Sequence, residues 1–171
     1  MSALFPVQRQ LAIAGGVAAL VVVAATLVKS QQPAQRPARP NPPPAAVSNT
    51  RVVVYKSPTC GCCEAWVTYM RANGFTVEVH DQDDVTPIKR ASGVPVALES
   101  CHTAQVGGYV VEGHVPVAAI RRMLRERPPI AGLAVAGMVA GTPGMEAGNQ
   151  HPPYDVTSFT REGRTAVYER H

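Results

Sequence analysis

The chain contains 171 residues, of which 46% are hydrophobic and 16% are charged, and this balance excludes an intrinsically disordered protein. The formal net charge is only +4 at neutral pH and the basic residues are scattered, which argues against a nucleic-acid-binding protein. The length suits about one globular domain together with targeting or linker segments.

Residues 11–28 are uncharged and largely apolar, and they lie between Arg9 and Lys29. A run of this length is at the lower limit of a membrane span, whereas the apolar part of a cleavable signal peptide has about 7 to 15 residues. We therefore expect residues 1–29 to be a membrane anchor or a signal peptide, and we favour the anchor slightly. Either one predicts that the remaining chain is periplasmic, held at the membrane or released by cleavage.

Residues 30–50 are rich in proline and show no hydrophobic period. Proline removes backbone N–H donors and favours an extended polyproline conformation, so this stretch is typical of a linker. The folded domain is therefore expected to span residues 51–171.

The first elements expected in that domain surround three cysteines. A short β-branched run over residues 51–55 predicts a buried strand, and residues 64–73 predict a helix that ends at Gly74. Ser57 and Thr59 are the candidate N-cap residues of this helix. Three apolar side chains share one stripe of it: Trp66, Val67 and Met70.

The elements that follow complete an α/β pattern. Residues 75–80 predict a half-buried strand and residues 84–91 a short helix. Two strands over residues 103–106 and 109–112 flank adjacent glycines, which is a strong hairpin signal, and Pro116 begins another helix. The order βαβαββα is the thioredoxin-like arrangement.

The C-terminal part of the domain is less regular. Residues 132–148 hold too many glycines for a regular element, so we expect a loop over the domain that carries Met138 and Met145. Residues 154–159 and 165–169 predict a second hairpin.

The cysteines are the strongest chemical signal. An even number of cysteines in an exported chain most often forms disulfides, but pairing adjacent cysteines is strained, so a purely structural framework is awkward. Cys60 and Cys63 form a C-x-x-C pair at a helix start, where the helix dipole lowers a thiol pKa and favours disulfide exchange. Exchange does not require the additional thiol of Cys62.

Metal binding explains the additional sulfur. The thiolates of Cys60, Cys62 and Cys63 within one turn, with Cys101 as a fourth, suit a soft d10 ion such as copper(I), and bridging thiolates can hold several copper(I) ions. Zinc is the rival ion, but its usual second C-x-x-C knuckle is missing. From the residues alone, copper(I) binding and disulfide exchange are about equally favoured.

Other side chains are weaker candidate ligands. A fold that brings Cys101 to the cluster also brings His102, although a hydrogen-bonded structural histidine is an equal alternative. Met138 and Met145 carry soft thioethers, yet methionine more often serves packing. The remaining internal histidines are expected at surface or hairpin positions: His80, His114 and His151.

Three stretches together carry a family resemblance: YKSPTCGCCEAW at residues 55–66, SCHTAQVGGYVVEGHVP at residues 100–116, and GLAVAGM with GTPGMEAG within residues 132–148. They closely resemble the CopG-like family of exported proteins, long catalogued as a domain of unknown function. The resemblance extends from residue 51 to residue 169. It implies a thioredoxin-like fold, a role in bacterial copper handling or resistance, and a copper(I)-thiolate centre with oxidoreductase chemistry.

Carried over by motif, the copper ligands are Cys60, Cys62, Cys63 and Cys101. The partners that the resemblance implies are copper ions and other copper-handling or electron-transfer proteins of the periplasm. Two hypotheses therefore stay open: a copper-binding or copper-redox protein, and a thiol-disulfide oxidoreductase. A zinc-stabilised interaction module is the third and least favoured.

Overall fold

A computed structural model describes residues 50–149 and 151–171 of the chain. The expected membrane anchor or signal peptide at residues 1–29, and the Pro-rich linker up to residue 49, lie outside these residues. Within the described ranges, no helix is long and apolar enough to cross a membrane.

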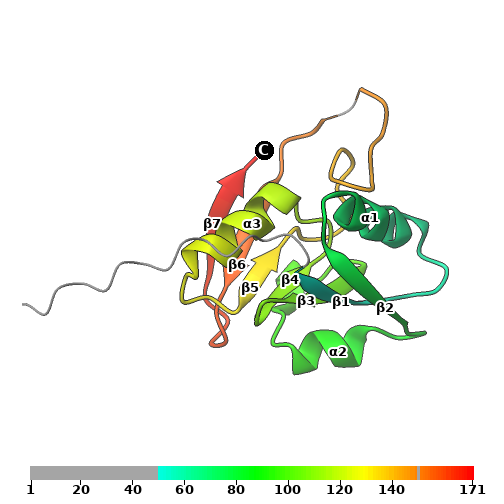
Figure 1. Ribbon diagram of the computed structural model, residues 1–171. Coiled ribbons are helices and arrows are strands. Elements are labelled where there is room, and N and C mark those ends of the chain that lie inside the picture. Colours follow the sequence, from blue (N-terminus) through cyan, green and yellow to red (C-terminus); the bar gives the residue numbers. More distant parts are fainter. Residues whose placement is uncertain (1–49, 150) are drawn as a thin grey trace, which may run out of the picture. The chain divides into compact units, whose positions relative to one another are not determined.

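One mixed sheet of seven strands organises the described residues, in the order β2-β1-β3-β4-β5-β6-β7 (Figure 1). Its strands are β1 (Arg51–Lys56), β2 (Thr76–Asp81), β3 (His102–Val106), β4 (Tyr109–Glu112), β5 (Gly132–Ala134), β6 (Asp155–Phe159) and β7 (Thr165–Arg170). The helices are α1 (Gly61–Ala72), α2 (Thr86–Ala91), the 3-10 turn η1 (Val96–Leu98) and α3 (Val117–Glu126). The expected mixed α/β class and the order βαβαββα as far as α3 are confirmed.

Strand direction places the ends of the central strands side by side. β1 is parallel to β2 and antiparallel to β3, and β3 is antiparallel to β4. The carboxyl end of β1 therefore meets the amino end of β3, where Lys56 is opposite His102. The turn that follows β1 and the segment that precedes β3 consequently approach each other.

The main core lies between the sheet and the helices α1 and α3. Trp66 and Met70 of α1 and Ile120 of α3 are fully buried in one apolar cluster with strand residues such as Val54. The indole N–H of Trp66 donates to the carbonyl oxygen of Val115 at 3.1 Å, so this large side chain buries no unpaired polar atom. α2 lies on the other face of the sheet (Figure 1).

The start of α1 differs from the expectation. The helix begins at Gly61, and its N-cap is Cys60, whose side chain makes no capping hydrogen bond. The prediction that Ser57 or Thr59 caps the helix was wrong, because these residues form the preceding turn: Ser57 Oγ accepts the Thr59 N–H at 3.4 Å, and the Ser57 carbonyl accepts the Cys60 N–H at 3.1 Å. Cys62 therefore lies in the first turn of the helix.

Two glycine signals are confirmed. Gly74 ends α1 with φ +81°, and the N–H groups of Gly74 and Phe75 bond back to the helix carbonyls as in a Schellman motif. Gly107 and Gly108 turn the β3–β4 hairpin with φ +57° and +89°, values that suit a type I′ turn.

The glycine-rich segment was predicted wrongly at its start. The expected loop over residues 132–148 begins with β5, which pairs with β4 and β6 inside the sheet. Gly132 permits this pairing because a Cβ there would overlap the carbonyl oxygen of Val110 and approach the Phe159 ring to 2.8 Å. The second hairpin, β6–β7, is confirmed, and β5 joins it to the sheet.

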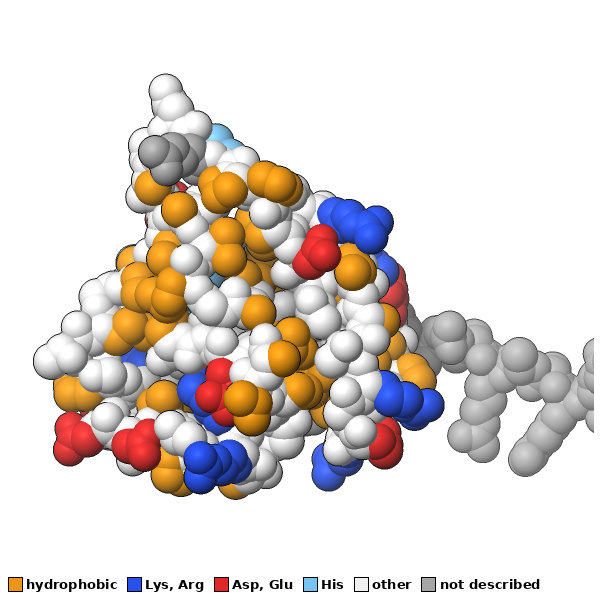
Figure 2. All heavy atoms as spheres, turned by 180° about the vertical axis from the view of Figure 1, so that it is seen from behind, with side chains coloured by type: hydrophobic (Ala, Val, Ile, Leu, Met, Phe, Trp, Pro, Cys, Tyr) orange, Lys and Arg blue, Asp and Glu red, His pale blue; other side chains and the backbone are white. Residues whose placement is uncertain are grey.

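The surface carries charges of both signs. On the side shown in Figure 2, hydrophobic side chains gather over the middle, and charged side chains lie mainly toward the margins. The basic groups on this face are dispersed, as they are in the sequence.

Candidate metal centre

The fold brings the four cysteines together. Their sulfur atoms all lie within 4.8 Å of one another. Cys60, Cys62 and Cys63 come from the start of α1, and Cys101 comes from the residue before β3. The antiparallel pairing of β1 with β3 explains the meeting, because both segments are at the same end of these strands.

Two cysteines are oxidised in this structure. Cys60 and Cys63 form a disulfide with a Cα–Cα distance of 5.3 Å, while Cys62 and Cys101 are free thiols. The sulfur of Cys62 lies 3.4 Å from that of Cys60. The site therefore holds a disulfide and two thiols in one cluster, which is enough for internal thiol-disulfide exchange.

The thiol of Cys101 resists ionisation. Its pKa is raised to about 12, first because burial disfavours the thiolate, and second because a negative charge on Cys62 would be close. A bound cation would reverse this effect, since a coordinating thiol is deprotonated. Without a cation, Cys101 stays protonated at neutral pH.

A buried histidine faces Cys101. The Nε2 atom of His114 lies 3.0 Å from Cys101 Sγ, and its Nδ1 lies 2.8 Å from the carbonyl oxygen of Pro143. Because a carbonyl only accepts, Nδ1 carries the proton and Nε2 presents a lone pair to the sulfur. Burial lowers the pKa of His114 and favours this neutral form.

A second buried histidine lies beside the first. His102 Nδ1 is 3.3 Å from Cys101 Sγ, and the ring packs 4.6 Å from Trp66 and 5.1 Å from His114 between centroids. Its Nε2 is buried and has no hydrogen-bond partner among the described residues. Burial holds the pKa of His102 well below its usual value. Cys101, His102 and His114 thus form a second close group of soft and borderline donors.

The expectation of a surface or hairpin position for His114 was wrong about the surface, because only 1% of the residue is exposed. The β3–β4 register explains its place: Thr103 is opposite Glu112, so the same antiparallel register continued outwards places residue 114 opposite residue 101. Counting back from the Gly-Gly turn would have shown this. His80 and His151 are exposed, as expected.

The predicted methionine candidates lie in the loop after β5. Met138 is 55% exposed, and Met145 is partly buried. The loop itself contacts the centre, because a Cβ on Gly144 would be 2.7 Å from the Trp66 backbone nitrogen and 3.0 Å from the Cys62 carbonyl oxygen. Together with the bond between His114 and Pro143, this contact holds residues 143–144 against the start of α1.

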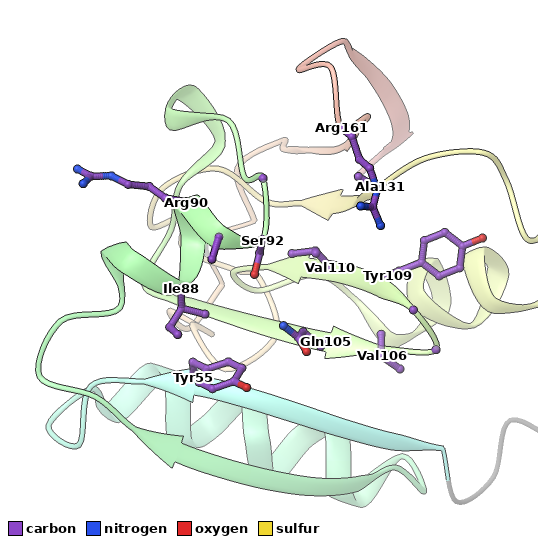
Figure 3. A pocket seen from close by; sticks show the side chains of 14 residues that line it. Tyr55, Ile88, Arg90, Ser92, Gln105, Val106, Tyr109, Val110, Ala131 and Arg161 are labelled. Carbon is purple, nitrogen blue, oxygen red and sulfur yellow. The ribbon is translucent and has the colours of Figure 1, made fainter.

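A cavity of about 580 Å³ lies elsewhere, between α2, the β3–β4 hairpin and the β6–β7 turn. Figure 3 shows Tyr55 and Gln105 rising from the sheet toward Ile88 of α2. The lining of this cavity includes none of the four cysteines.

Comparison with known proteins gives the family. Two solved structures, titled copper resistance protein copG Form 2 and Form 1, are each 40% identical to this chain with a TM-score of 0.69. The match covers 72% of this chain and 99% and 98% of theirs. The chain belongs to the CopG-like family. Residues 98–145 also match a family model described as a protein of unknown function, DUF411, and no curated protein matches.

Membership of the CopG-like family confirms the resemblance inferred from the sequence motifs. The segment matched by the family model contains Cys101, both buried histidines and Met138, whereas Cys60, Cys62 and Cys63 precede it. The candidate centre is therefore assembled from residues on both sides of the start of that segment.

Proposed function

We propose that this chain is an extracytoplasmic copper(I)-binding protein of copper homeostasis or resistance. The observation that carries the proposal is the cluster of four cysteine sulfurs within 4.8 Å of one another, in a chain 40% identical to two proteins titled copper resistance protein. The ligands are the thiolates of Cys60, Cys62, Cys63 and Cys101.

Ligand softness supports copper(I) over hard cations. Thiolates select copper(I), zinc and iron–sulfur clusters, and the irregular spacing of these four differs from paired zinc knuckles. Their mutual distances suit sulfur atoms that bridge more than one copper(I) ion. Zinc is the less favoured ion.

The imidazoles extend the donor set on one side of the cluster. His114 presents an Nε2 lone pair to Cys101, and the buried His102 has one ring nitrogen without a partner among the described residues. An unpaired buried nitrogen is costly unless a ligand satisfies it. We include both histidines with the thiolates, and Met138 is a further candidate ligand that would have to turn inwards from its exposed position.

Copper loading requires reduction of the site. A sulfur in the Cys60–Cys63 disulfide has no thiolate charge to offer, so two electrons must reach this bond before all four cysteines can bind. We propose that a periplasmic electron-transfer or copper-handling protein supplies them, and copper redox chemistry is part of this proposal.

A thioredoxin-like classification belongs to the same proposal. It is supported by the order βαβαββα, with the sheet order β2-β1-β3-β4 and a C-x-x-C pair at the start of α1. Export rests on residues 1–29 as an anchor or signal peptide, with residues 30–50 as the linker and 51–171 as the metal-binding domain.

A thiol-disulfide oxidoreductase is the second candidate function. The Cys60–Cys63 disulfide at a helix N-terminus favours it, because such pairs exchange with other dithiols. The free thiols of Cys62 and Cys101 beside the disulfide distinguish this site from a simple two-cysteine centre.

The deciding experiment is the metal content of the full-length chain purified without oxygen and reduced. We expect copper(I) to be retained against a moderate competing chelator, and to be displaced only weakly by zinc. A quadruple Cys→Ser variant at the four positions is the control. Reduced wild-type protein that retains no more copper than this control would refute the proposal and leave disulfide exchange.

A further inference from the structure

We propose that the buried pair Lys89–Glu112 positions Cys101 for metal binding. The inference rests on the copper-binding function proposed above. Neither residue contacts the sulfur cluster directly in the described hydrogen bonds, so both are positioning residues rather than ligands.

The pair is almost fully enclosed. The Lys89 side chain, on α2, is 4% exposed, the Glu112 side chain, on β4, is 0% exposed, and Nζ lies 2.5 Å from Oε1. Lys89 also donates to the hydroxyl of Thr103 at 3.2 Å, and that hydroxyl donates to Glu112 Oε2 at 2.7 Å. Thr103 is the direct cross-strand partner of Glu112.

The same carboxylate holds the backbone beside Cys101. Glu112 Oε1 accepts the backbone N–H of Ser100 at 2.6 Å, where a strand would use a carbonyl. One carboxylate thus hydrogen-bonds to Ser100, which precedes Cys101, and to Thr103, which follows it. The Glu112 carboxylate therefore fixes the position of the backbone that carries Cys101 into β3.

Close packing reinforces the attachment. Gly113 follows Glu112 on the chain, and a Cβ there would lie 2.6 Å from Cβ of Ser100. Ser100 Oγ in turn donates to the carbonyl oxygen of Gly137 at 2.5 Å. Residue 100 is therefore enclosed by β4 and by the loop after β5, and it has little freedom to move Cys101.

Stability alone does not account for a charged pair here. Burial raises the pKa of the Glu112 carboxyl above its usual value even with Lys89 beside it, so desolvation outweighs the attraction. A well-packed apolar pair is often as stable as a buried ion pair. An apolar pair would offer no acceptor for the Ser100 N–H. This hydrogen bond is the contact that holds the residue next to Cys101.

Two double variants of the full-length chain separate positioning from charge. In Lys89→Met with Glu112→Leu, both charges are removed together and the Ser100 N–H loses its acceptor. In Lys89→Met with Glu112→Gln, the amide oxygen still accepts this N–H and the amide nitrogen can donate to Thr103. Val156→Ala, at a fully buried residue of β6, is the control for lost stability away from the site.

We expect the Met/Leu variant to bind copper(I) about 10- to 100-fold more weakly, as is typical when partners behind a metal ligand are lost. In metal-free reduced protein its Cys101 should react faster with iodoacetamide, while Cys62 reacts as in wild type. The Met/Gln variant should restore both values, and Val156→Ala should change neither.

The inference is overturned if the Met/Leu variant keeps wild-type copper affinity and Cys101 reactivity, or if Val156→Ala reproduces its losses. Loss of affinity in a folded Met/Gln variant would also overturn it, because charge rather than position would then matter. If Met/Leu does not fold, Thr103→Val removes both hydrogen bonds of the Thr103 hydroxyl, one to each member of the pair, and an unchanged Cys101 reactivity contradicts positioning. Failure of the proposed function is distinct: wild type itself would not bind copper(I), while the reactivity measurement still tests the positioning.

Discussion

At the scale of single residues, the chemistry centres on sulfurs that share one small volume. Cys62 is the informative member, because Cys60 and Cys63 already supply a dithiol and are paired in this structure. Its sulfur lies 3.4 Å from that of Cys60, close enough to join a metal cluster or to compete in exchange. Substituting this residue separates the two candidate functions.

Cys62→Ser should lower both the copper(I) content and the copper affinity of the reduced full-length chain, because one thiolate of four is lost. A pure exchange enzyme should retain its dithiol activity, since Cys60 and Cys63 remain. Copper titration and a disulfide-reduction assay on the same samples measure both effects. Cys60→Ser is the matched control, which should abolish dithiol activity. Unchanged copper binding with unchanged dithiol activity in Cys62→Ser would favour the oxidoreductase.

Copper binding should also release a proton from Cys101. Its pKa of about 12 keeps the metal-free thiol protonated at neutral pH, whereas the coordinated form is a thiolate. Affinity should therefore fall as the pH falls, by about tenfold per pH unit for this proton. Titrating copper(I) into weakly buffered protein measures the release. Cys101→Ser should release about one proton fewer per chain, and equal release would contradict this ionisation.

At the scale of elements, the start of α1 and the loop after β5 form one unit. Gly144 has φ +83° and touches the backbone of α1 so closely that no side chain fits between them. The hydrogen bond from His114 Nδ1 to the carbonyl oxygen of Pro143 holds the residue next to Gly144. The loop thus sets the position of the helix end that carries three cysteines.

Gly144→Ala should lower the free energy of unfolding by about 1–3 kcal/mol more than backbone strain alone. Gly163→Ala is the matched control, because Gly163 has φ +77° and open space around its Cα, so only strain of about 1–2 kcal/mol is expected. Urea denaturation of both variants gives the comparison. Equal losses in the two variants would show that the contact of Gly144 with α1 contributes nothing.

At the scale of the whole molecule, the sheet and its core are complete within the described residues. The first core side chain is Val52, and the last strand ends at Arg170. The domain proposed from the sequence, residues 51–171, contains all of these elements.

Residues 51–171 should therefore fold without the first 50 residues. The Pro-rich stretch over residues 30–50, which we propose as a linker, has no apolar period in its sequence with which to complete the core. Circular dichroism of the shortened chain in reducing buffer should show mixed helix and strand with a cooperative thermal transition. A disordered spectrum, both with and without copper, would disprove this domain boundary.

The four-cysteine centre predicts that oxidation and metal binding exclude each other, because the sulfurs of the Cys60–Cys63 disulfide have no thiolate charge to donate. Copper-loaded protein should resist alkylation at Cys60, Cys62, Cys63 and Cys101 together, whereas oxidised metal-free protein should expose thiols only at Cys62 and Cys101. Alkylation followed by mass spectrometry measures both states. Equal reactivity of Cys101 in both states, with the other three protected by copper, would reduce the site to three cysteines.

Much of the fold could be predicted from local signals. The β-branched run of β1, the apolar stripe of α1 and the Gly-Gly turn each depend on residues close together in the chain. Their patterns can therefore be recognised in the sequence. β5 could not be recognised this way. Its three residues have no period of their own, and it is a strand because β4 and β6 bond to it from both sides.

The sequence by itself determined the set of cysteines, their place at a helix start and the family to which the motifs belong. Only the tertiary structure decided that His114 faces Cys101. It also decided that Lys89 and Glu112 form a buried pair that contacts Ser100, in the segment before β3. The His114–Cys101 and Lys89–Glu112 contacts join residues 13 and 23 positions apart. The physical reason is that strand register and burial, which arise only when the sheet assembles, determine which polar side chains meet.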